Sequence, residues 1–183
     1  MSRITWILGA VLLLGLGAFL HYTLPQRDVV RILGTEIKRE AHQIENAQGE
    51  VVTRPEDVRY IQTVDTEGNP HVYRNQDTGW GWPPYFKFDS ANLATRADNA
   101  TSTEENPKWY VVTHYGWRMT LFSLFPNAVG LERAEGPDQS ITPWFNIAVV
   151  ALVIAALLAL RHRLLRLFER LGPGRREGEA EES

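Results

Sequence analysis

The sequence contains no cysteine, so disulfide bridges and thiolate metal sites are excluded. It also lacks the short motifs of several enzyme classes: G-x-S-x-G around a serine, the Walker phosphate-binding loop, and G-x-G-x-x-G. Gly79-Trp80-Gly81 comes nearest to the last motif, but two prolines follow, and a phosphate-binding helix cannot begin there. We therefore expect no cofactor, no metal site and no catalytic residue. An envelope hydrolase remains an alternative class.

Charged residues are missing from two long stretches, residues 4–24 and 144–160. A helix of about 20 apolar residues crosses the hydrocarbon core of a bilayer, so both stretches predict transmembrane helices. Pro25 ends the first stretch, and Thr142-Pro143 followed by Trp144 is a typical start for the second. Two alternatives stay open: a secretory signal peptide for the first stretch and a buried core helix for the second.

Basic residues set the predicted orientation of these two helices. The segment after the second apolar run is rich in arginine, and Arg3 precedes the first run. Positively charged flanks stay in the cytoplasm, so both termini are predicted to lie there. The four domains that we predict are an anchor over 1–25, an outer domain over 26–141, a helix with a basic amphipathic extension over 142–171, and a disordered cytoplasmic tail over 172–183. The residues expected on the membrane surface are Arg161, Arg163, Arg166 and Arg170.

Small and polar residues within the two apolar runs suggest contacts between helices. Ala151, Ala155 and Ala159 recur every four residues, a spacing that lets helices approach closely. Alanine is also common in such helices without any special role. Asn146 needs a polar partner in lipid, and we predict that it faces His21 or Thr23 near the outer end of the first helix, or a loop group above them.

The domain between the apolar runs is acidic. Residues 25–142 hold 12 Lys and Arg against 17 Asp and Glu, a net charge of −5. Nucleic-acid binding needs a basic surface, so this class of partner is excluded. The partners that remain are the lipid bilayer, other envelope proteins and a second copy of the chain.

Short alternating segments predict a β-rich domain. Residues 28–38 alternate with a change of phase at Gly34, as a β-bulge would produce, and residues 58–64 and 71–73 are typical of a hairpin. Residues 40–57 and 94–107 are polar and predict loops. Further strands are predicted over 85–88, 108–113 and 128–133. Five to seven short strands with no long amphipathic helix indicate a membrane protein whose two transmembrane α-helices flank a small, mostly-β extracytoplasmic domain, a barrel or a sandwich.

Aromatic residues gather over 80–88, between two aspartates. Exposed rings bind sugar faces or apolar ligands while carboxylates hold hydroxyl groups, so these residues are candidates for ligand binding. The simpler interpretation is that the rings fill the core of a small domain. We predict Phe86 or Phe88 in the core and at least one of the other rings exposed. A metal site of His71 and His114 with Asp77 or Asp89 is a weaker hypothesis. The candidates for ligand binding are Trp80, Trp82, Tyr85, Asp77, Asp89, His114, Trp117 and Arg118.

Several longer strings carry a family resemblance. The segments HYTLPQRDVVRILGTEIKR, VYRNQDTGWGWPPYFKFDSANL, THYGWR, FPNAVG and ITPWFNI resemble an uncharacterised bacterial family, the domain of unknown function numbered fifteen-twenty-three. The similarity extends from about His21 to Ile147. It implies an inner-membrane protein with two spans and supplies no catalytic residues.

The sequence therefore favours a protein of the bacterial inner membrane that presents a periplasmic β domain for protein or glycan contact. An accessory subunit of an envelope transporter or secretion assembly is the alternative.

Overall fold

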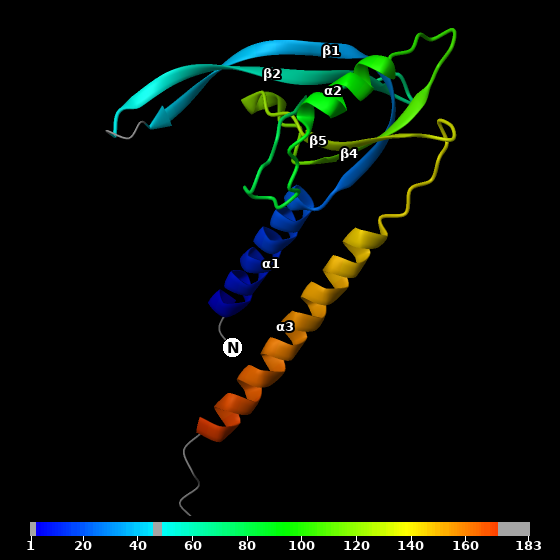
Figure 1. The fold of residues 1–183 in the computed structure, drawn as a ribbon. Coiled ribbons are helices and arrows are strands. Elements are labelled where there is room, and N and C mark those ends of the chain that lie inside the picture. Colours follow the sequence, from blue (N-terminus) through cyan, green and yellow to red (C-terminus); the bar gives the residue numbers. More distant parts are fainter. Residues whose placement is uncertain (1–2, 46–48, 172–183) are drawn as a thin grey trace, which may run out of the picture. The chain divides into compact units, whose positions relative to one another are not determined.

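The computed structural model describes residues 3–45 and 49–171. It consists of two compact units, Met1–Ile141 and Thr142–Ser183. The first unit holds helix α1 (Arg3–Thr23) and a β-rich domain, and the second holds helix α3 (Trp144–Leu171) (Figure 1). The predicted disordered tail over 172–183 lies outside the described residues.

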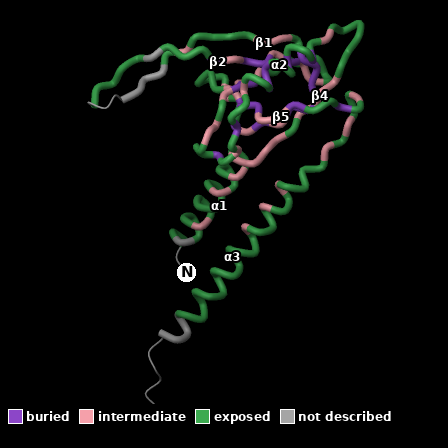
Figure 2. Tube along the Cα trace, viewed as in Figure 1, coloured by how far each residue is buried: buried purple, intermediate pink, exposed green. Residues whose placement is uncertain are grey.

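Both uncharged runs form helices. Within α1 and α3, the stretches Trp6–Thr23 and Trp144–Leu167 are long and apolar enough to cross a membrane, and neither is buried by the rest of the protein (Figure 2). The predicted continuation of the second helix beyond Leu160 is confirmed, because α3 extends to Leu171. Two apolar helices thus flank a mostly-β domain, as the sequence predicts.

Five strands in the described part of the chain form a sheet that closes on itself. They are β1 (Gln26–Glu45), β2 (Val51–Asp65), β3 (Pro70–Asn75), β4 (Trp109–Tyr115) and β5 (Asn127–Arg133). Their order around the barrel is β1-β2-β3-β5-β4, and β4 pairs antiparallel with the beginning of β1. The predicted hairpin of β2 and β3 is confirmed, with Thr63 opposite His71.

A β-bulge divides β1 into two parts. The register against β2 shifts between Ile32 and Gly34, which confirms the change of phase predicted at Gly34. Before the bulge, Val30 and Ile32 are fully buried. The barrel interior is formed by these two side chains with Ile61, Tyr73, Val112, Ala128 and Leu131.

The barrel closes between β3 and β5 through few backbone contacts. A single parallel pair, Arg74 with Asn127, joins the two strands, and the Arg74 N–H donates to the Pro126 carbonyl at 2.8 Å. The Asn127 side chain extends this pairing: its Oδ1 accepts from the Gln76 N–H at 3.0 Å, and its Nδ2 donates to the Gln76 carbonyl at 3.1 Å. One buried amide therefore replaces a second strand pair.

The long loop predicted over residues 40–57 is wrong. Strands β1 and β2 extend through this region as a hairpin, paired from Val30 with Asp65 to Glu45 with Val51. Its outer part leaves the barrel as a two-stranded arm (Figure 1). The side chains of such an arm need not alternate between core and solvent, so the polar sequence concealed the strands.

The loop predicted over residues 94–107 is also wrong in its first half. Helix α2 (Ser90–Asn99) covers the barrel there, and Leu93, Ala94 and Ala97 are buried beneath it. These three residues lie on one face at helical spacing. Small alanine side chains let the helix approach the sheet closely, and they carried little hydrophobic signal in the sequence.

Candidate functional site

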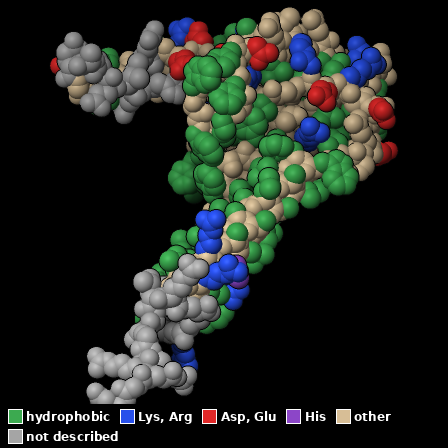
Figure 3. Space-filling model, turned by 60° about the horizontal axis from the view of Figure 1, so that its bottom comes forward, with side chains coloured by type: hydrophobic (Ala, Val, Ile, Leu, Met, Phe, Trp, Pro, Cys, Tyr) green, Lys and Arg blue, Asp and Glu red, His purple; other side chains and the backbone are tan. Residues whose placement is uncertain are grey.

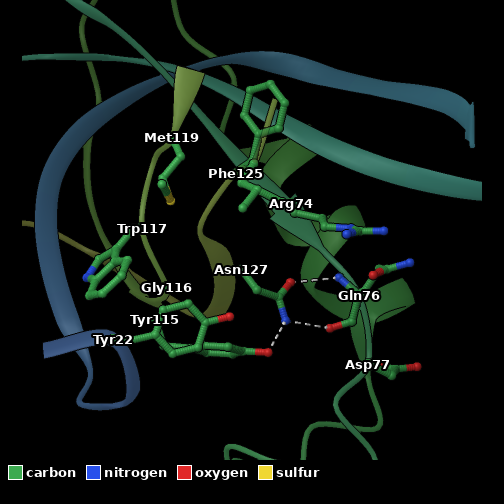
Figure 4. A pocket seen from close by; sticks show the side chains of 11 residues that line it. Tyr22, Arg74, Gln76, Asp77, Tyr115, Gly116, Trp117, Met119, Phe125 and Asn127 are labelled. Carbon is green, nitrogen blue, oxygen red and sulfur yellow. Dashed lines mark hydrogen bonds between the residues drawn. The ribbon is translucent and has the colours of Figure 1, made fainter. Parts of the chain in front are cut away.

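A pocket opens at the end of the barrel that adjoins α1. Its volume is about 170 Å³. Tyr22, in the last turn of α1, forms one wall together with residues that follow β3 and β4 (Figure 4). The residues that line it are Tyr22, Arg74, Gln76, Asp77, Tyr115, Gly116, Trp117, Met119, Leu124, Phe125 and Asn127.

Aromatic rings form much of this pocket. The Tyr22 ring stands nearly perpendicular to that of Trp117, with centroids 5.4 Å apart, and edge-on to that of Tyr115 at 6.3 Å. Gly116 lies between Tyr115 and Trp117 in the chain and has a positive φ of 91°, a conformation that favours glycine. A Cβ there would also meet Pro126 and the Tyr22 ring at 3.7 Å. The glycine thus holds two rings against the end of α1.

Polar groups form the facing wall of the pocket. Asn127 is buried and is held by Gln76, and it also donates to the Tyr115 hydroxyl at 3.3 Å (Figure 4). Arg74 donates to the Glu40 carboxylate at 2.8 Å. Asp77 accepts from the Ser90 N–H at 2.8 Å through one carboxylate oxygen. The pocket therefore combines flat apolar rings with fixed amide, guanidinium and carboxylate groups.

The candidate residues from the sequence divide between this pocket and its surroundings. Asp77 and Trp117 line it directly. Arg118 lies over the Phe125 ring, 4.0 Å from its centroid, and donates to the Leu124 carbonyl at 2.9 Å. Asp89 is exposed at the start of α2 and caps it without a side-chain hydrogen bond.

The remaining aromatic candidates belong to the segment between β3 and α2, which we call the aromatic loop (residues 77–89). No strand forms over 85–88, contrary to prediction. Phe86 and Phe88 are exposed, so the predicted core position of either ring is wrong, as is the interpretation of the segment as core filling. Trp80 and Trp82 are exposed as well.

Tyr85 behaves differently from its neighbours in this loop. Its ring stacks on Tyr115 with centroids 4.8 Å apart, and its hydroxyl donates to the Thr23 carbonyl at 2.7 Å. It therefore joins the loop to both the pocket and the end of α1.

Lys87 is the charged residue of the aromatic loop that is buried. Its side chain donates to the Ala128 carbonyl at 2.7 Å and to the Asn75 side-chain oxygen. Burial lowers the pKa of Lys87 to about 8, although Asp77 and Asp89 act in the opposite direction. A single cation within an otherwise uncharged aromatic run was the signal that sequence analysis overlooked.

A second polar cluster lies in the barrel. His114 Nε2 is 2.8 Å from Asp28 Oδ2, and the Tyr73 hydroxyl donates to the same oxygen at 2.7 Å. Burial alone would raise the pKa of Asp28, but the hydrogen bonds of His114 and Tyr73 outweigh it and lower the pKa overall. His71 pairs instead with Asp65 at 3.2 Å. The hypothesis of a metal site with Asp77 or Asp89 is wrong, because the two histidines belong to separate pairs with other carboxylates.

The candidate residues of the apolar helices lie as follows. His21 accepts a hydrogen bond from Trp117 Nε1 at 2.8 Å. Ala151, Ala155 and Ala159 are exposed on α3, and Asn146 is half-buried in its first turn. Arg161, Arg163 and Arg166 are exposed further along α3, whereas the Arg170 side chain lies outside the described part. The predicted contact of Asn146 with His21 or Thr23 stays a prediction.

The fold and the pocket define a class of protein: a small closed β domain joined directly to an apolar helix and followed by a second one. The chain belongs to the family described as protein of unknown function (DUF1523), whose model matches residues 1–168. A relative from Haemophilus influenzae, described as an uncharacterized protein, is 33% identical over 138 residues, which cover 75% of this chain and 78% of the relative. No solved structure matches the chain significantly.

Proposed function

We propose that this chain is a protein of the bacterial inner membrane, with α1 and α3 as its two spans. Both termini lie in the cytoplasm and the β domain lies in the periplasm. The length and composition of both helices support this arrangement. The arginines that follow residue 160 support it as well, because basic residues next to a span favour the cytoplasmic side.

The function that we propose for the periplasmic domain is binding of a glycan unit in the pocket beside α1. The observation that carries this proposal is the pairing of aromatic rings with fixed polar groups around a volume of about 170 Å³. Sugar rings present an apolar face that stacks on aromatic side chains and hydroxyl groups that bond to amides and carboxylates. Trp117 and Tyr115 supply the rings, and Asp77 and Gln76 supply polar groups.

Non-catalytic binding fits the chemistry of the same region better than hydrolysis. A hydrolase needs a nucleophile held by a general base. His71 Nε2 pairs with Asp65 and His114 Nε2 pairs with Asp28, and His114 Nδ1 has no hydrogen-bond partner among the described residues. In the described part of the chain neither imidazole therefore holds a hydroxyl that it could activate.

The test measures the binding of mono- and disaccharides to the full chain in detergent by titration calorimetry. Trp117→Ala should weaken binding about tenfold or more, since loss of one stacked ring costs about 1.4 kcal/mol. Trp109→Ala, at the other end of β4, is the matched control and should bind as the parent does. Equal affinity of all three proteins, or no binding by any of them, would contradict the proposal.

A second candidate function is that of an accessory subunit of an envelope assembly, and the β1–β2 arm favours it. Ile37, Val51 and Val52 are exposed there on a two-stranded ribbon, which pairs with no third strand among the described residues. Such ribbons are only marginally stable alone and gain from a partner. Purification from a detergent extract should then yield a stoichiometric complex, and Ile37→Asp should remove it while Leu121→Asp leaves it intact.

A further inference from the structure

Four large rings of the aromatic loop face outward. The exposed fractions are 85% for Trp80, 66% for Trp82, 53% for Phe86 and 56% for Phe88. Trp80 lies edge-on to both phenylalanines, with centroids 5.4 and 5.6 Å apart, so three of the rings form one cluster. Exposed apolar surface of this extent on a folded domain marks a site of interaction.

The loop holds these rings outward in a fixed shape. The N–H groups of Thr78 and Gly79 both donate to the Lys87 carbonyl at 3.1 Å, and the Lys87 N–H donates back to the Thr78 hydroxyl at 3.0 Å. Buried Lys87 then fastens the base of the loop to Asn75 and Ala128. Because the base is closed, the rings cannot turn into the core without breaking these bonds.

Between Asp77 and Asp89, which end the loop, its outward surface carries no charge. From Thr78 to Phe88 the only ionisable group besides Tyr85 is Lys87, whose side chain points inward. A glycan-binding surface would place carboxylates or amides beside the rings, and a protein interface would have a polar rim. Uncharged tryptophan and phenylalanine with a glycine–proline backbone fit the interface of a bilayer instead.

The loop also adjoins the helix that is proposed to cross the membrane. Trp82 stacks on Phe19 of α1 with centroids 5.7 Å apart and an interplanar angle of 13°. Phe19 precedes the end of α1 by four residues, about 6 Å along the helix axis. Trp82 thus lies at a depth where the outer end of a span meets the headgroups.

A second loop also carries exposed apolar side chains. It joins β4 to β5 and includes the short helix η1 (Thr120–Phe122). Leu121 and Phe122 are exposed in it. Figure 3, in which the α1 end of the domain comes forward, shows hydrophobic side chains gathered over this face of the domain.

We propose that the aromatic loop is a lipid-binding surface, which inserts Trp80, Trp82, Phe86 and Phe88 into the headgroup region of the outer leaflet. This inference rests on the proposed role of α1 as a membrane span. It concerns a surface distinct from the glycan pocket, and it makes the bilayer itself the partner of the β domain.

The experiment uses the full chain in phosphatidylcholine vesicles whose acyl chains carry bromine near the headgroup, a quencher of tryptophan emission. Replacing both loop tryptophans in one variant, Trp80→Phe with Trp82→Phe, should reduce the emission that bromine quenches. Trp109→Phe, far from α1 on β4, is the matched control and should leave the quenched emission unchanged. Trp6→Phe, within α1, reports separately on the span.

The outcomes separate the loop from the span. If the loop variant and the Trp109 variant leave the quenched emission equally unchanged while Trp6→Phe reduces it, α1 crosses the bilayer and the lipid-binding loop is refuted. If Trp6→Phe changes nothing either, the proposed span is refuted together with the loop. A thermal melt of each variant in detergent verifies folding, which exposed Trp-to-Phe changes preserve.

Discussion

Residues 77–89 and 90–100 are neighbours in the chain and opposite in their burial. The aromatic loop has five rings and leaves four of them exposed. The alanine-rich helix α2 and its C-cap residue, in contrast, bury Leu93, Ala94, Ala97 and Ala100. Side-chain size therefore does not decide which segment forms the core. A helical repeat of small residues can approach the barrel closely, while large rings on a closed loop remain outside.

The largest change in the free energy of unfolding that would sharpen this contrast is expected for a substitution in α2. Leu93→Ala removes a buried side chain from the barrel core and should lower the free energy of unfolding by about 2–5 kcal/mol. Leu121→Ala, at a position that is 87% exposed, should change it by less than about 0.5 kcal/mol. Thermal and urea unfolding of the full chain in detergent measures both, and equal losses would remove the distinction.

The next effect concerns the polar part of the interior. Asp28→Ala leaves the buried Tyr73 hydroxyl and His114 without their shared acceptor, and we expect a loss of about 1–3 kcal/mol at neutral pH. The matched control is Asp57→Ala, which breaks an exposed ion pair with Arg39 and should cost less stability than Asp28→Ala does. A result in the reverse order would mean that the cluster does not stabilise the barrel.

Because the pKa of Asp28 is lowered in the folded state, the ionised cluster stabilises the fold above the ordinary carboxyl range, and this contribution is lost as pH falls through the lowered pKa. The parent protein should thus lose stability in acid more steeply than Asp28→Ala does. Parallel unfolding curves of the two proteins down to acidic pH would contradict this expectation.

A smaller effect is expected at Lys87, where the loop meets the core. Its pKa is about 8 in the folded protein and 10.5 in the unfolded chain, so between these values the unfolded chain binds more protons. Stability should therefore rise with pH above about 8, by about 1 kcal/mol up to the range where tyrosines ionise. Lys87→Met should abolish the rise, and Lys108→Met, at an exposed position, should retain it.

The smallest effect is expected in the aromatic loop itself. Trp80→Ala should change the stability of the chain in detergent by less than about 0.5 kcal/mol, because the ring is mostly exposed. A loss comparable to that of Leu93→Ala, measured in the same unfolding experiment, would show that the rings are part of the core and would erase the comparison.

Sequence patterns predicted the parts of the fold whose periodicity is undisturbed. The uncharged runs, the hairpin after Val58 and the bulge at Gly34 each have a local signal that depends on few residues. The arm and α2 were missed for physical reasons. Pro55 and the charges of the arm are typical of loops, yet they are tolerated in a ribbon with open edges. The buried face of α2 consists mainly of alanine, which carries little hydrophobic signal.

The candidate pocket was predictable only in fragments. Asp77 and Trp117 were recognised by residue type, but Tyr22, Tyr115 and Asn127 come from three distant segments that only the closure of the barrel brings together. The burial of Lys87 depends on its hydrogen bond to Asn75 in the core, and no local sequence pattern identifies Asn75 as that partner.

The short connection between α1 and β1 has a mechanical consequence. Only Leu24 and Pro25 separate Thr23 from Gln26, and the Gly116 N–H donates to the Tyr22 carbonyl at 2.9 Å across the junction. A helix in a bilayer that is thinner than its apolar length tilts to compensate. With so stiff a junction, α1 in its proposed role as a membrane span would incline the β domain together with itself, including the β1–β2 arm. Bilayer thickness would then determine how far above the membrane the arm extends, and this height can be measured by fluorescence energy transfer in lipids of graded chain length.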